Sequence, residues 1–278
     1  MVSSVGLPLR SAVWYDKAMT NIHSLIENID PEKVAFSGDW HGNLKAARKA
    51  IRYAAKGGAE VLIQVGDFGV WEPYGFIRAV SDEAKRFDML VLVTPGNHED
   101  YDYLDSLDSP VLGNVIFLPR GFRWSWSGVS FLAVGGAGSR DRTWRLDEQA
   151  RGGKKSWWEQ EYITSLDVEK ATSGGPVDVL VSHDAPLGYG STLPIEPRLA
   201  NIPDDMLFKP NLIDSILADK SAGRLDEIFD QVRPSTLVHG HFHVRHTGEY
   251  RGCTIESLGR DRDILPNVTI IRGFTKLA

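Results

Sequence analysis

The chain has 278 residues, of which 42% are hydrophobic and 24% are charged, so its composition is that of an ordinary globular protein. Its net charge of −6 argues against a sequence-independent grip on long nucleic acid, and no apolar run approaches the ~20 residues of a membrane span. Cys253 is the only cysteine, which excludes an intramolecular disulfide, and we expect a cytoplasmic protein with neither a membrane partner nor an extended nucleic-acid partner.

The first half of the chain alternates apolar runs with amphipathic stretches. Residues 11–28 have helical periodicity, and we expect residues 1–32 to form a helical extension that packs on the main domain. Three buried strands are predicted next, and they end at Asp39, Asp67 and Gly96. Helices are predicted between these strands, over about 43–56 and 74–87. This β-α-β-α-β order predicts a mainly parallel sheet covered by helices.

The second half combines strands with long irregular segments. Residues 115–118 and 129–134 are predicted to be neighbouring antiparallel strands around a turn. Residues 139–175 and 184–210 are predicted to form loops or insertions over the site, with one helix near 156–166. The remaining elements are a helix over about 211–232 and β-structure at 247–258 and 268–272.

Five short polar motifs follow or close the apolar runs. They are Gly-Asp-Trp-His-Gly-Asn at 38–43, Gly-Asp-Phe-Gly at 66–69, Gly-Asn-His-Glu at 96–99, Ser-His-Asp at 182–184 and His-Gly-His-Phe-His at 239–243. Each motif offers Asp, Asn or His, which bind hard and borderline divalent metals. Ligands at strand ends converge on one edge of a sheet, where open α/β sheets place active sites. A single Asp after a strand would indicate only a turn or a helix cap, but six of the eight histidines lie in these motifs.

The ordered set of motifs, from about Val34 to His243, resembles the calcineurin-like metallophosphoesterase superfamily, in its small bacterial and phage form. The resemblance implies an α/β fold, a four-layer α/β/β/α sandwich with mixed sheets and metal ligands at strand ends. We therefore interpret residues 1–278 as a single domain of this kind. The resemblance also implies the ligands, which are Asp39, His41 and His243 for one metal, Asn97, His183 and His241 for the other, and Asp67 as a bridge.

Such a centre implies that a hydroxide bridging the two metals attacks a phosphate ester. Two divalent ions, two Asp ligands and a hydroxide leave about one positive charge, which suits an anionic ester, and a metal can lower the pKa of bound water to near ~7. By the same resemblance, Asp67 and His98 are catalytic, and His98 contacts the phosphate and protonates the leaving oxygen. Three carboxylates remain candidates for orienting His98: Glu99, Glu72 and Asp184. His239 is predicted either to orient a ligand or the substrate, or to be structural.

Two further sets of side chains could contact a substrate. Arginines near a glycine-rich turn are predicted either to bind phosphate by forked hydrogen bonds or to be ion-paired in a loop: Arg140, Arg142 and Arg145. Three tryptophans could stack a nucleobase, although core packing is the favoured interpretation: Trp144, Trp157 and Trp158.

The residues after Gly66-Asp67 help to distinguish between the classes of phosphoesterase in this superfamily. Ser/Thr protein phosphatases of this superfamily carry Gly-Asp-x-Val-Asp-Arg-Gly, whereas this chain has Gly-Asp-Phe-Gly-Val-Trp-Glu over 66–72. Without the Asp-Arg pair the chain looks more like the small bacterial and phage metallophosphoesterases, and that resemblance implies a phosphodiesterase acting on small nucleotide-type diesters, cyclic nucleotides included. The alternatives are a phosphomonoesterase or protein Ser/Thr phosphatase, a nuclease, and a non-catalytic scaffold, against which the intact motifs argue. The ligand set predicts two divalent ions, with Mn²⁺ favoured over Zn²⁺ or iron.

Overall fold

The computed structural model describes residues 22–194, 209–263 and 267–272. Residues 22–27 are helical, and Ile22 and Ile26 of this helix are fully buried in the core. Trp126 Nε1 donates a hydrogen bond to the Ile26 carbonyl at 2.9 Å. Residues 1–21, which hold the first part of the helix predicted over 11–28, and residues 195–208 of the predicted 184–210 insertion lie outside the described residues.

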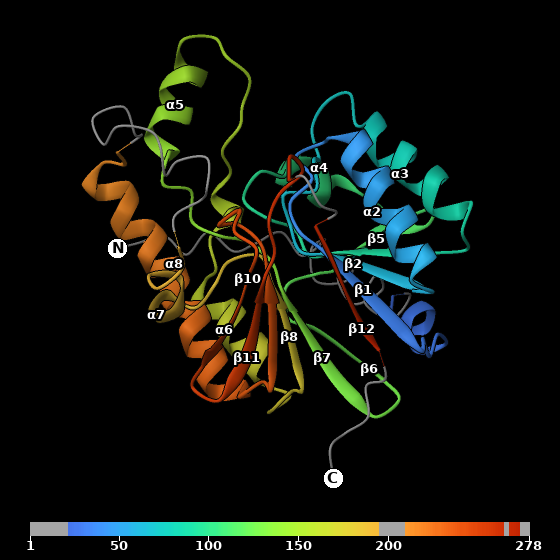
Figure 1. Cartoon of the computed structure of the whole chain (residues 1–278). Coiled ribbons are helices and arrows are strands. Elements are labelled where there is room, and N and C mark those ends of the chain that lie inside the picture. Colours follow the sequence, from blue (N-terminus) through green and yellow to red (C-terminus); the bar gives the residue numbers. More distant parts are fainter. Residues whose placement is uncertain (1–21, 195–208, 264–266, 273–278) are drawn as a thin grey trace.

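Two six-stranded sheets lie between two sets of helices (Figure 1). The first sheet has the order β12-β1-β2-β3-β5-β4, with β1 at Lys33–Ser37, β2 at Val61–Gln64, β3 at Leu90–Val93, β4 at Val111–Leu112, β5 at Val115–Phe117 and β12 at Val268–Arg272. Its four central strands are parallel, and β12 and β4 are antiparallel edge strands. The predicted mainly parallel sheet is therefore confirmed.

Three helices belong to the first sheet: α2 (Leu44–Lys56), α3 (Gly75–Lys85) and α4 (Tyr101–Ser106). The alternation of side chains along the strands explains how α2 and α3 cover its outer face. Leu62 and Val91 point outward and pack against Ile51 of α2 and Ile77 of α3. The Asn43 side chain caps α2 by accepting a hydrogen bond from the Ala46 N–H at 3.2 Å.

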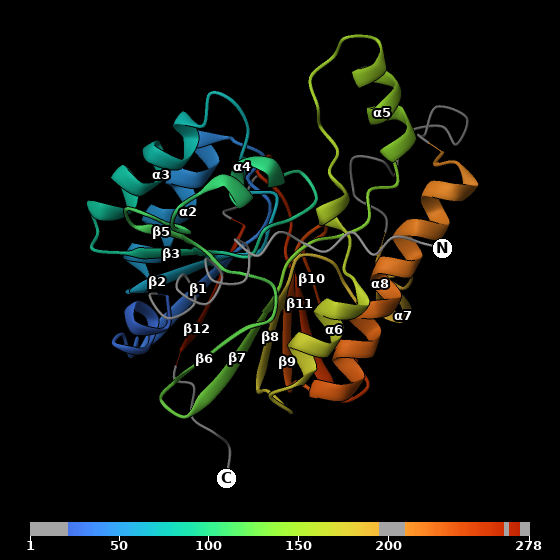
Figure 2. The ribbon, with the colours of Figure 1, turned by 180° about the vertical axis from the view of Figure 1, so that it is seen from behind.

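The second sheet has the order β10-β11-β9-β8-β7-β6, with β6 at Phe122–Trp126, β7 at Val129–Val134, β8 at Val179–Ser182, β9 at Thr236–His239, β10 at His246–Tyr250 and β11 at Cys253–Ser257. Helices α6 (Ser165–Thr172), α7 (Leu187–Gly190) and α8 (Leu212–Val232) are associated with this half, and Leu225 and Phe229 of α8 pack against Leu180 of β8. Seen from behind, α2 and α3 lie on one side of the two sheets, and α6 and α8 lie on the other side (Figure 2). Every described helix is too short or too polar to cross a lipid bilayer.

A layer of buried, mostly apolar side chains lies between the inner faces of the two sheets. Phe36 and Ile63 from the first sheet and Trp124, Phe131 and Val181 from the second belong to one buried cluster. The rings of Trp124 and Phe131 stack with centroids 5.0 Å apart. With helices on both outer faces, this contact makes the predicted four-layer α/β/β/α sandwich, with mixed sheets.

Two local predictions are wrong. Residues 115–118 and 129–134 do not pair, because β5 joins the first sheet and β7 joins the second, where it pairs with β6 over 122–126. The sequence analysis missed β6, although buried and more exposed side chains alternate along it, with Phe122, Trp124 and Trp126 pointing into the core. This alternation is the pattern that could have predicted the strand.

The helix predicted near 156–166 is also wrong. The structure instead has α5 (Arg142–Ala150), a 3-10 turn at Glu159–Glu161 and α6, which begins only at Ser165. Thr164 and Asp167 form a capping box that sets the start of α6.

Candidate metal centre

The polar motifs lie at the carboxyl ends of strands in both sheets. Asp39 follows β1, Asp67 follows β2 and Asn97 follows β3 in the first sheet. His183 follows β8, and the motif at 239–243 begins at the last residue of β9 in the second sheet. Because these strands are parallel within each sheet, their carboxyl ends lie together. The structure thus brings five separated segments to one place.

Asp39, His41, Asp67 and His243 form a first group of metal-ligating side chains. One ligand atom from each lies within 4.8 Å of all the others. His41 Nε2 lies 3.3 Å from Asp67 Oδ2, and His243 Nε2 lies 3.1 Å from Asp39 Oδ2. Two carboxylates and two imidazoles that face one point are a donor set for a divalent transition metal.

Asn97, His183 and His241 form a second group, also next to Asp67. Asn97 Oδ1 lies 3.1 Å from His183 Nε2 and 3.2 Å from His241 Nδ1. Asp67 Oδ1 lies 3.2 Å from His183 Nε2, while Asp67 Oδ2 faces His41. Asp67 therefore presents one carboxylate oxygen to each group.

The charges and hydrogen bonds of the site fit a bound cation. Asp39 Oδ2 is buried and has no hydrogen-bond donor among the described residues, which is costly unless a cation neutralises it. His183 Nδ1 lies 2.8 Å from the Val65 carbonyl, which leaves Nε2 to face Asp67 and Asn97. Burial lowers the pKa of His183, but the Asp67 carboxylate outweighs burial and raises this pKa to about 10. Acceptors that hold a proton this tightly can hold a metal ion in its place.

Four of the predicted ligands have left-handed backbone conformations. The φ angles of His41, Asp67, His241 and His243 are 44°, 51°, 66° and 57°. Such conformations are uncommon outside glycine, cost about 1–3 kcal/mol each, and occur preferentially at active sites. We infer that the surrounding fold holds these loops in place so that the four side chains face common points.

Two glycines let neighbouring loops approach the buried carboxylates. A Cβ atom on Gly96 would collide with Asp67, and one on Gly240 would collide with Asp39. Close approach lets the His98 backbone N–H donate a hydrogen bond to Asp67 Oδ1 at 3.1 Å. The backbone thereby fixes the orientation of the carboxylate that both groups share.

Asp261, which no motif indicated, orients one of the predicted ligands. Asp261 Oδ1 lies 3.3 Å from His41 Nδ1, and Asp261 Oδ2 accepts a hydrogen bond from Asn43 Nδ2 at 2.8 Å. Burial lowers the pKa of His41, but hydrogen bonds to Asp261 and Asp67 raise it to about 10. A carboxylate behind a histidine is the usual partner of a metal-ligating imidazole. In the sequence, only a charged turn at 260–263 marks this position.

We expect Asp261→Asn to weaken metal binding by about 10- to 100-fold, because it removes the charge behind His41 at almost unchanged volume. Calorimetric titration of metal-free protein with Mn²⁺ measures the dissociation constant. Asp263→Asn, an exposed change in the same turn, is the matched control and should leave the constant within about twofold. Equal constants for Asp261→Asn and the wild type would contradict this role.

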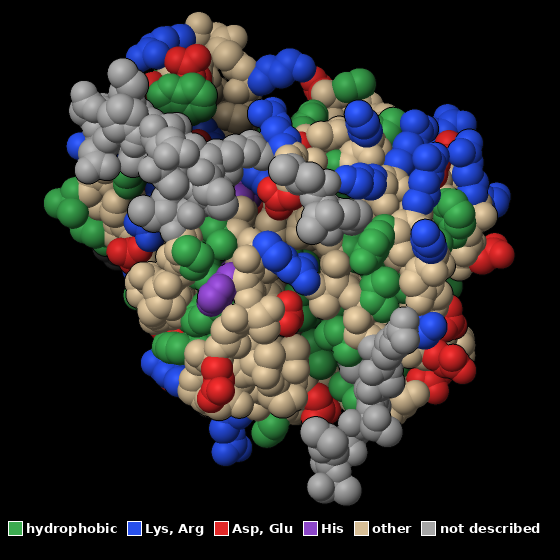
Figure 3. All heavy atoms as spheres, in the orientation of Figure 1, with side chains coloured by type: hydrophobic (Ala, Val, Ile, Leu, Met, Phe, Trp, Pro, Cys, Tyr) green, Lys and Arg blue, Asp and Glu red, His purple; other side chains and the backbone are tan. Residues whose placement is uncertain are grey.

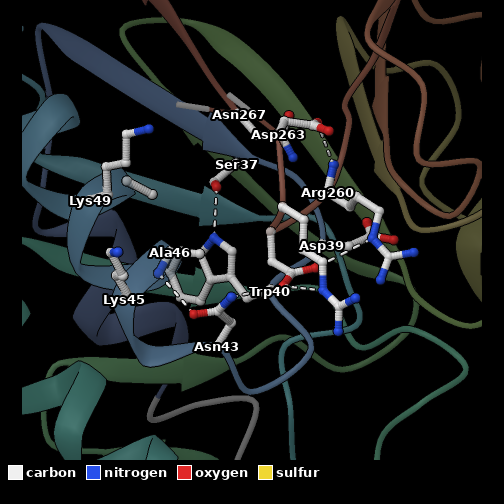
Figure 4. Close-up of a pocket in the computed structure, with 13 residues that line it drawn as sticks. Ser37, Asp39, Trp40, Asn43, Lys45, Ala46, Lys49, Arg260, Asp263 and Asn267 are labelled. Carbon is white, nitrogen blue, oxygen red and sulfur yellow. Dashed lines mark hydrogen bonds and ion pairs between the residues drawn. The ribbon is translucent and has the colours of Figure 1, made fainter. Parts of the chain in front are cut away.

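A cavity of about 280 Å³ lies beside the same turn (Figure 4). Its walls include Lys45 and Lys49 of α2 and Arg260 and Arg262 of the turn, and Asp39 also lines it. Figure 3 shows Lys and Arg side chains gathered over α2 and α3 on this face. Asp261 and Asp263 also line this cavity, and both arginines pair with Asp261, so the cations and carboxylates on its walls partly neutralise each other.

His98 lies next to Asp67 and contacts Arg145. His98 Nε2 is 3.9 Å from Asp67 Oδ2 and 2.9 Å from Arg145 Nη2. The buried guanidinium of Arg145 is fixed from behind, since Nη1 donates to the Asn97 carbonyl at 3.3 Å and Nε faces Asp141 Oδ1 at 2.9 Å. Burial lowers the pKa of His98 to about 4; Asp67 acts against this shift and Arg145 adds to it.

None of the three carboxylates proposed from sequence orients His98. Glu99 accepts hydrogen bonds from two backbone N–H groups, Glu72 forms an exposed ion pair, and Asp184 accepts from the N–H of the next residue. The side chain that contacts His98 is instead Arg145, which belongs to α5, a helix that the sequence analysis missed.

The other two predicted arginines differ in position. Arg140 lines a cavity at the centre, but its Nη2 is paired with Asp219 at 2.6 Å. Arg142 faces Asp214 at 3.9 Å and lies over the ring of Trp157 at 4.6 Å. The guanidinium at the centre is therefore Arg145 rather than Arg142.

His239 is fully buried, and its Nδ1 lies 2.9 Å from the Gly240 carbonyl. The ring meets those of Tyr189 and Phe242 edge-on, with centroids 6.1 and 5.9 Å away. Burial lowers the pKa of His239 to about 4. His239 is therefore enclosed by protein groups, at the start of the motif that carries His241 and His243.

Ser139 and Glu161 form a chain of hydrogen bonds that holds the Asn97 side chain. No sequence motif indicated Glu161. Asn97 Nδ2 donates to Ser139 Oγ at 2.9 Å, and the Ser139 N–H donates to Glu161 Oε1 at 2.8 Å. Burial raises the pKa of Glu161 from 4.5 to about 8.

A carboxyl group whose pKa is higher in the folded state stabilises the fold most below its unfolded pKa, and this contribution is lost as pH rises through the folded pKa. We therefore expect Glu161→Gln to gain stability relative to the wild type between about pH 4.5 and pH 8, by up to about 1.4 kcal/mol per pKa unit. Urea unfolding of metal-free protein at pH 5 and pH 9 measures the difference. The exposed Glu159→Gln is the control, and a pH-independent difference for Glu161→Gln would contradict the prediction.

Two cavities meet at His98. The first, here the metal cavity, has a volume of about 530 Å³ and is lined by Asp67, Asn97, His98, Trp144 and Arg145, among others. The second, here the aromatic cavity, has a volume of about 710 Å³ and is lined by Trp71, Tyr74, His98, Tyr103 and Trp158, among others. Trp144 is 56% exposed, whereas Trp158 is buried, so the predicted core packing describes Trp158 but not Trp144.

Comparisons with known proteins agree with the motifs. The family model described as calcineurin-like phosphoesterase matches residues 32–245. A Thermus thermophilus structure aligns over 83% of this chain and 90% of its own, with 12% identity and a TM-score of 0.48. A phosphopantetheinyl hydrolase from Mycobacterium tuberculosis aligns over 86% and 96%, with 17% identity and a TM-score of 0.44. A dimetal phosphatase from Danio rerio aligns over 87% and 93%, with 15% identity and a TM-score of 0.43. No curated protein matches the chain.

Proposed function

Because this chain belongs to the calcineurin-like phosphoesterase family, we propose that it is a metal-dependent phosphodiesterase that hydrolyses small nucleotide-type phosphodiesters, cyclic nucleotides included. The family and the cluster of His and Asp side chains make it a metal-dependent phosphoesterase. The preference for diesters, the metal and the role of each residue are the proposal.

The proposed ligands are Asp39, His41 and His243 for one ion, Asn97, His183 and His241 for the other, and Asp67 for both. Divalent ions at these positions would supply positive charge to the phosphoryl oxygens and acidity to bound water. Imidazole, carboxylate and amide donors suit Mn²⁺, Zn²⁺ or iron, and we favour Mn²⁺ for activity.

Arg145 and His98 are the side chains that we propose act on the substrate. Arg145 is buried, always charged and fixed by three partners, so it can bind a phosphoryl oxygen with little loss of entropy. Burial and the Arg145 contact lower the pKa of His98, and Asp67, 3.9 Å away, raises it; we propose that the negative charge of a bound substrate adds to the effect of Asp67, so that a protonated His98 donates its proton to the leaving oxygen. Arg140 lines the same cavity, and its guanidinium is paired with Asp219.

The observation that favours a diester is the position of His98 between the two cavities. An acyclic phosphodiester carries two separate alcohols, one that leaves and one that stays on phosphorus, so its site needs room on both sides of the phosphoryl group. The metal cavity and the aromatic cavity both border His98 and provide that room. A monoester has only a leaving alcohol and would leave one of the two cavities unused.

The test compares initial rates on bis-p-nitrophenyl phosphate and p-nitrophenyl phosphate. Metal-stripped protein is supplied with Mn²⁺, and Asn97→Ala serves as the inactive control for each substrate. We expect the diester to be hydrolysed with a kcat/KM at least about tenfold above that of the monoester, with both activities lost in the control. A higher kcat/KM on the monoester would overturn the diesterase proposal and favour a phosphomonoesterase.

A further inference from the structure

We propose that the aromatic cavity binds the leaving alcohol of the diester and selects an alcohol that carries a flat, uncharged aromatic ring, as a nucleoside does. The proposal rests on the diesterase function proposed above, and it adds which arm lies where and which residues select it. The juxtaposition that carries it is an aromatic-walled cavity of about 710 Å³ that borders His98.

The position of His98 decides which alcohol enters this cavity. In hydrolysis, hydroxide adds to phosphorus, the bond between phosphorus and the leaving oxygen breaks, and that oxygen takes a proton. If His98 gives this proton, the leaving alcohol lies on the His98 side of the phosphorus. The aromatic cavity extends from His98 away from the predicted ligands, none of which lines it, whereas the metal cavity is lined by Asp67, Asn97, His241 and His243. The retained alcohol therefore belongs in the metal cavity.

The walls of the aromatic cavity suit a flat ring. Tyr74 and Tyr103 stack on each other, with centroids 3.8 Å apart and planes 10° apart, and both line the cavity. Trp71 and Trp158 line the same cavity. Trp158 is buried, and Lys155 Nζ lies 5.4 Å from its ring centroid, while Trp71 is 40% exposed, so part of its ring is accessible to a ligand. Stacking on rigid aromatic side chains recognises a base without requiring a particular sequence of donors.

The charges of the aromatic cavity exclude a second phosphate. Each lysine on its wall is paired, Lys154 with Glu72 at 3.6 Å and Lys155 with Asp102 at 2.5 Å. Asp100 adds a further acidic group, and it accepts a hydrogen bond from a tyrosine hydroxyl at 2.7 Å. The wall therefore carries no excess positive charge, and an uncharged alcohol is favoured over a nucleotide that has additional phosphates.

Trp71 is also joined to the metal-binding loop. A Cβ atom on Gly42 would collide with the Trp71 ring, so the absence of a side chain at Gly42 lets the ring lie against the turn that follows His41. On the opposite wall, the Ser156 carbonyl accepts a hydrogen bond from Arg145 at 3.0 Å. These two contacts fix the positions of the two cavity walls relative to the groups that would contact the phosphoryl group.

The experiment compares two diesters that differ only in the leaving alcohol, methyl phenyl phosphate and methyl hexafluoroisopropyl phosphate. The two leaving alcohols have similar acidity, but only one is aromatic. We expect the Mn²⁺-loaded wild type to prefer the phenyl ester in kcat/KM by about tenfold or more, and Trp71→Ala to reduce this preference to less than about threefold. Trp144→Ala removes an exposed tryptophan from the metal cavity and should leave the ratio unchanged.

Binding of adenosine, measured by calorimetry, gives a readout that does not depend on turnover. We expect the dissociation constant to rise about tenfold in Trp71→Ala and to stay unchanged in Phe87→Ala, an exposed ring at the end of α3. A wild type that hydrolyses both esters equally well, or a Trp71→Ala variant that loses both activities in the same proportion, would overturn the assignment. Absence of hydrolysis of every diester would overturn the proposed function instead, and in that case adenosine binding that depends on Trp71 would still identify the cavity as a ring-binding site.

Discussion

Asp67→Asn is expected to reduce hydrolysis of bis-p-nitrophenyl phosphate by about a thousandfold or more. Asp67 is the one carboxylate that faces both groups of ligands, with oxygens 3.3 Å from His41 Nε2 and 3.2 Å from His183 Nε2. The substitution keeps the size of the side chain but removes its charge, and the metal centre would supply several kcal/mol of transition-state stabilisation. The neighbouring histidines, led by His183, outweigh burial and hold the pKa of Asp67 well below its usual range, so the wild-type side chain is ionised at neutral pH.

Metal content, measured by atomic emission after gel filtration, accompanies this activity measurement. We expect Asp67→Asn to retain at most one ion per chain where the wild type retains two. Asp82→Asn, an exposed change on α3, controls for the handling of a variant and should retain full activity. An Asp67→Asn variant with wild-type metal content and activity would show that the shared carboxylate is not a ligand.

His98→Ala is expected to lower kcat by about 10²- to 10⁴-fold while metal content stays that of the wild type. The side chain of His98 contacts Arg145 and lies 3.9 Å from Asp67, but it is not in either group of proposed ligands. If His98 protonates the leaving oxygen, the loss must depend on how much that oxygen needs a proton. We expect the loss to be about tenfold smaller for a p-nitrophenyl ester than for a phenyl ester.

Arg145→Lys is the companion variant, because it keeps the positive charge but removes the planar fork that holds His98 and the Asn97 carbonyl. It should raise KM and lower kcat without the leaving-group dependence expected for His98→Ala. Equal losses on both esters in His98→Ala would restrict His98 to binding the phosphate.

The order of strands and helices predicted the parallel part of the first sheet, and the four layers followed from the family resemblance that the motifs carry. The apolar runs of β1, β2 and β3 each lead to a polar motif, and parallel strands bring their carboxyl ends together. Helix α2 could also be predicted from local sequence, because its apolar residues recur with helical periodicity and Asn43 caps its start. The pairing of 115–118 with 129–134 failed because adjacency in sequence says nothing about which of two sheets a strand joins, and the chain crosses between the sheets at this point.

The groups that surround the predicted ligands could not be found in this way. Asp261 meets His41 across 220 positions of sequence, and the two come together only because β11 returns the chain to the first motif. Arg140 and Arg142 were the favoured substrate contacts, whereas the arginine that contacts His98 is Arg145, and its position depends on hydrogen bonds to the carbonyl groups of Asn97 and Ser156 that no pattern reveals. Helix α5, which carries Arg145, has no other buried residue and therefore no apolar periodicity to predict it.

The most direct test of the two-ion centre is a titration of metal-free protein with Mn²⁺ in which bound ions and initial rate of diester hydrolysis are measured on the same samples. The proposed ligands predict that two ions bind per chain, and that the rate rises with occupancy of the second. A rate that saturates at one bound ion, or a protein that binds no ion in the micromolar range, would contradict the assignment of both groups.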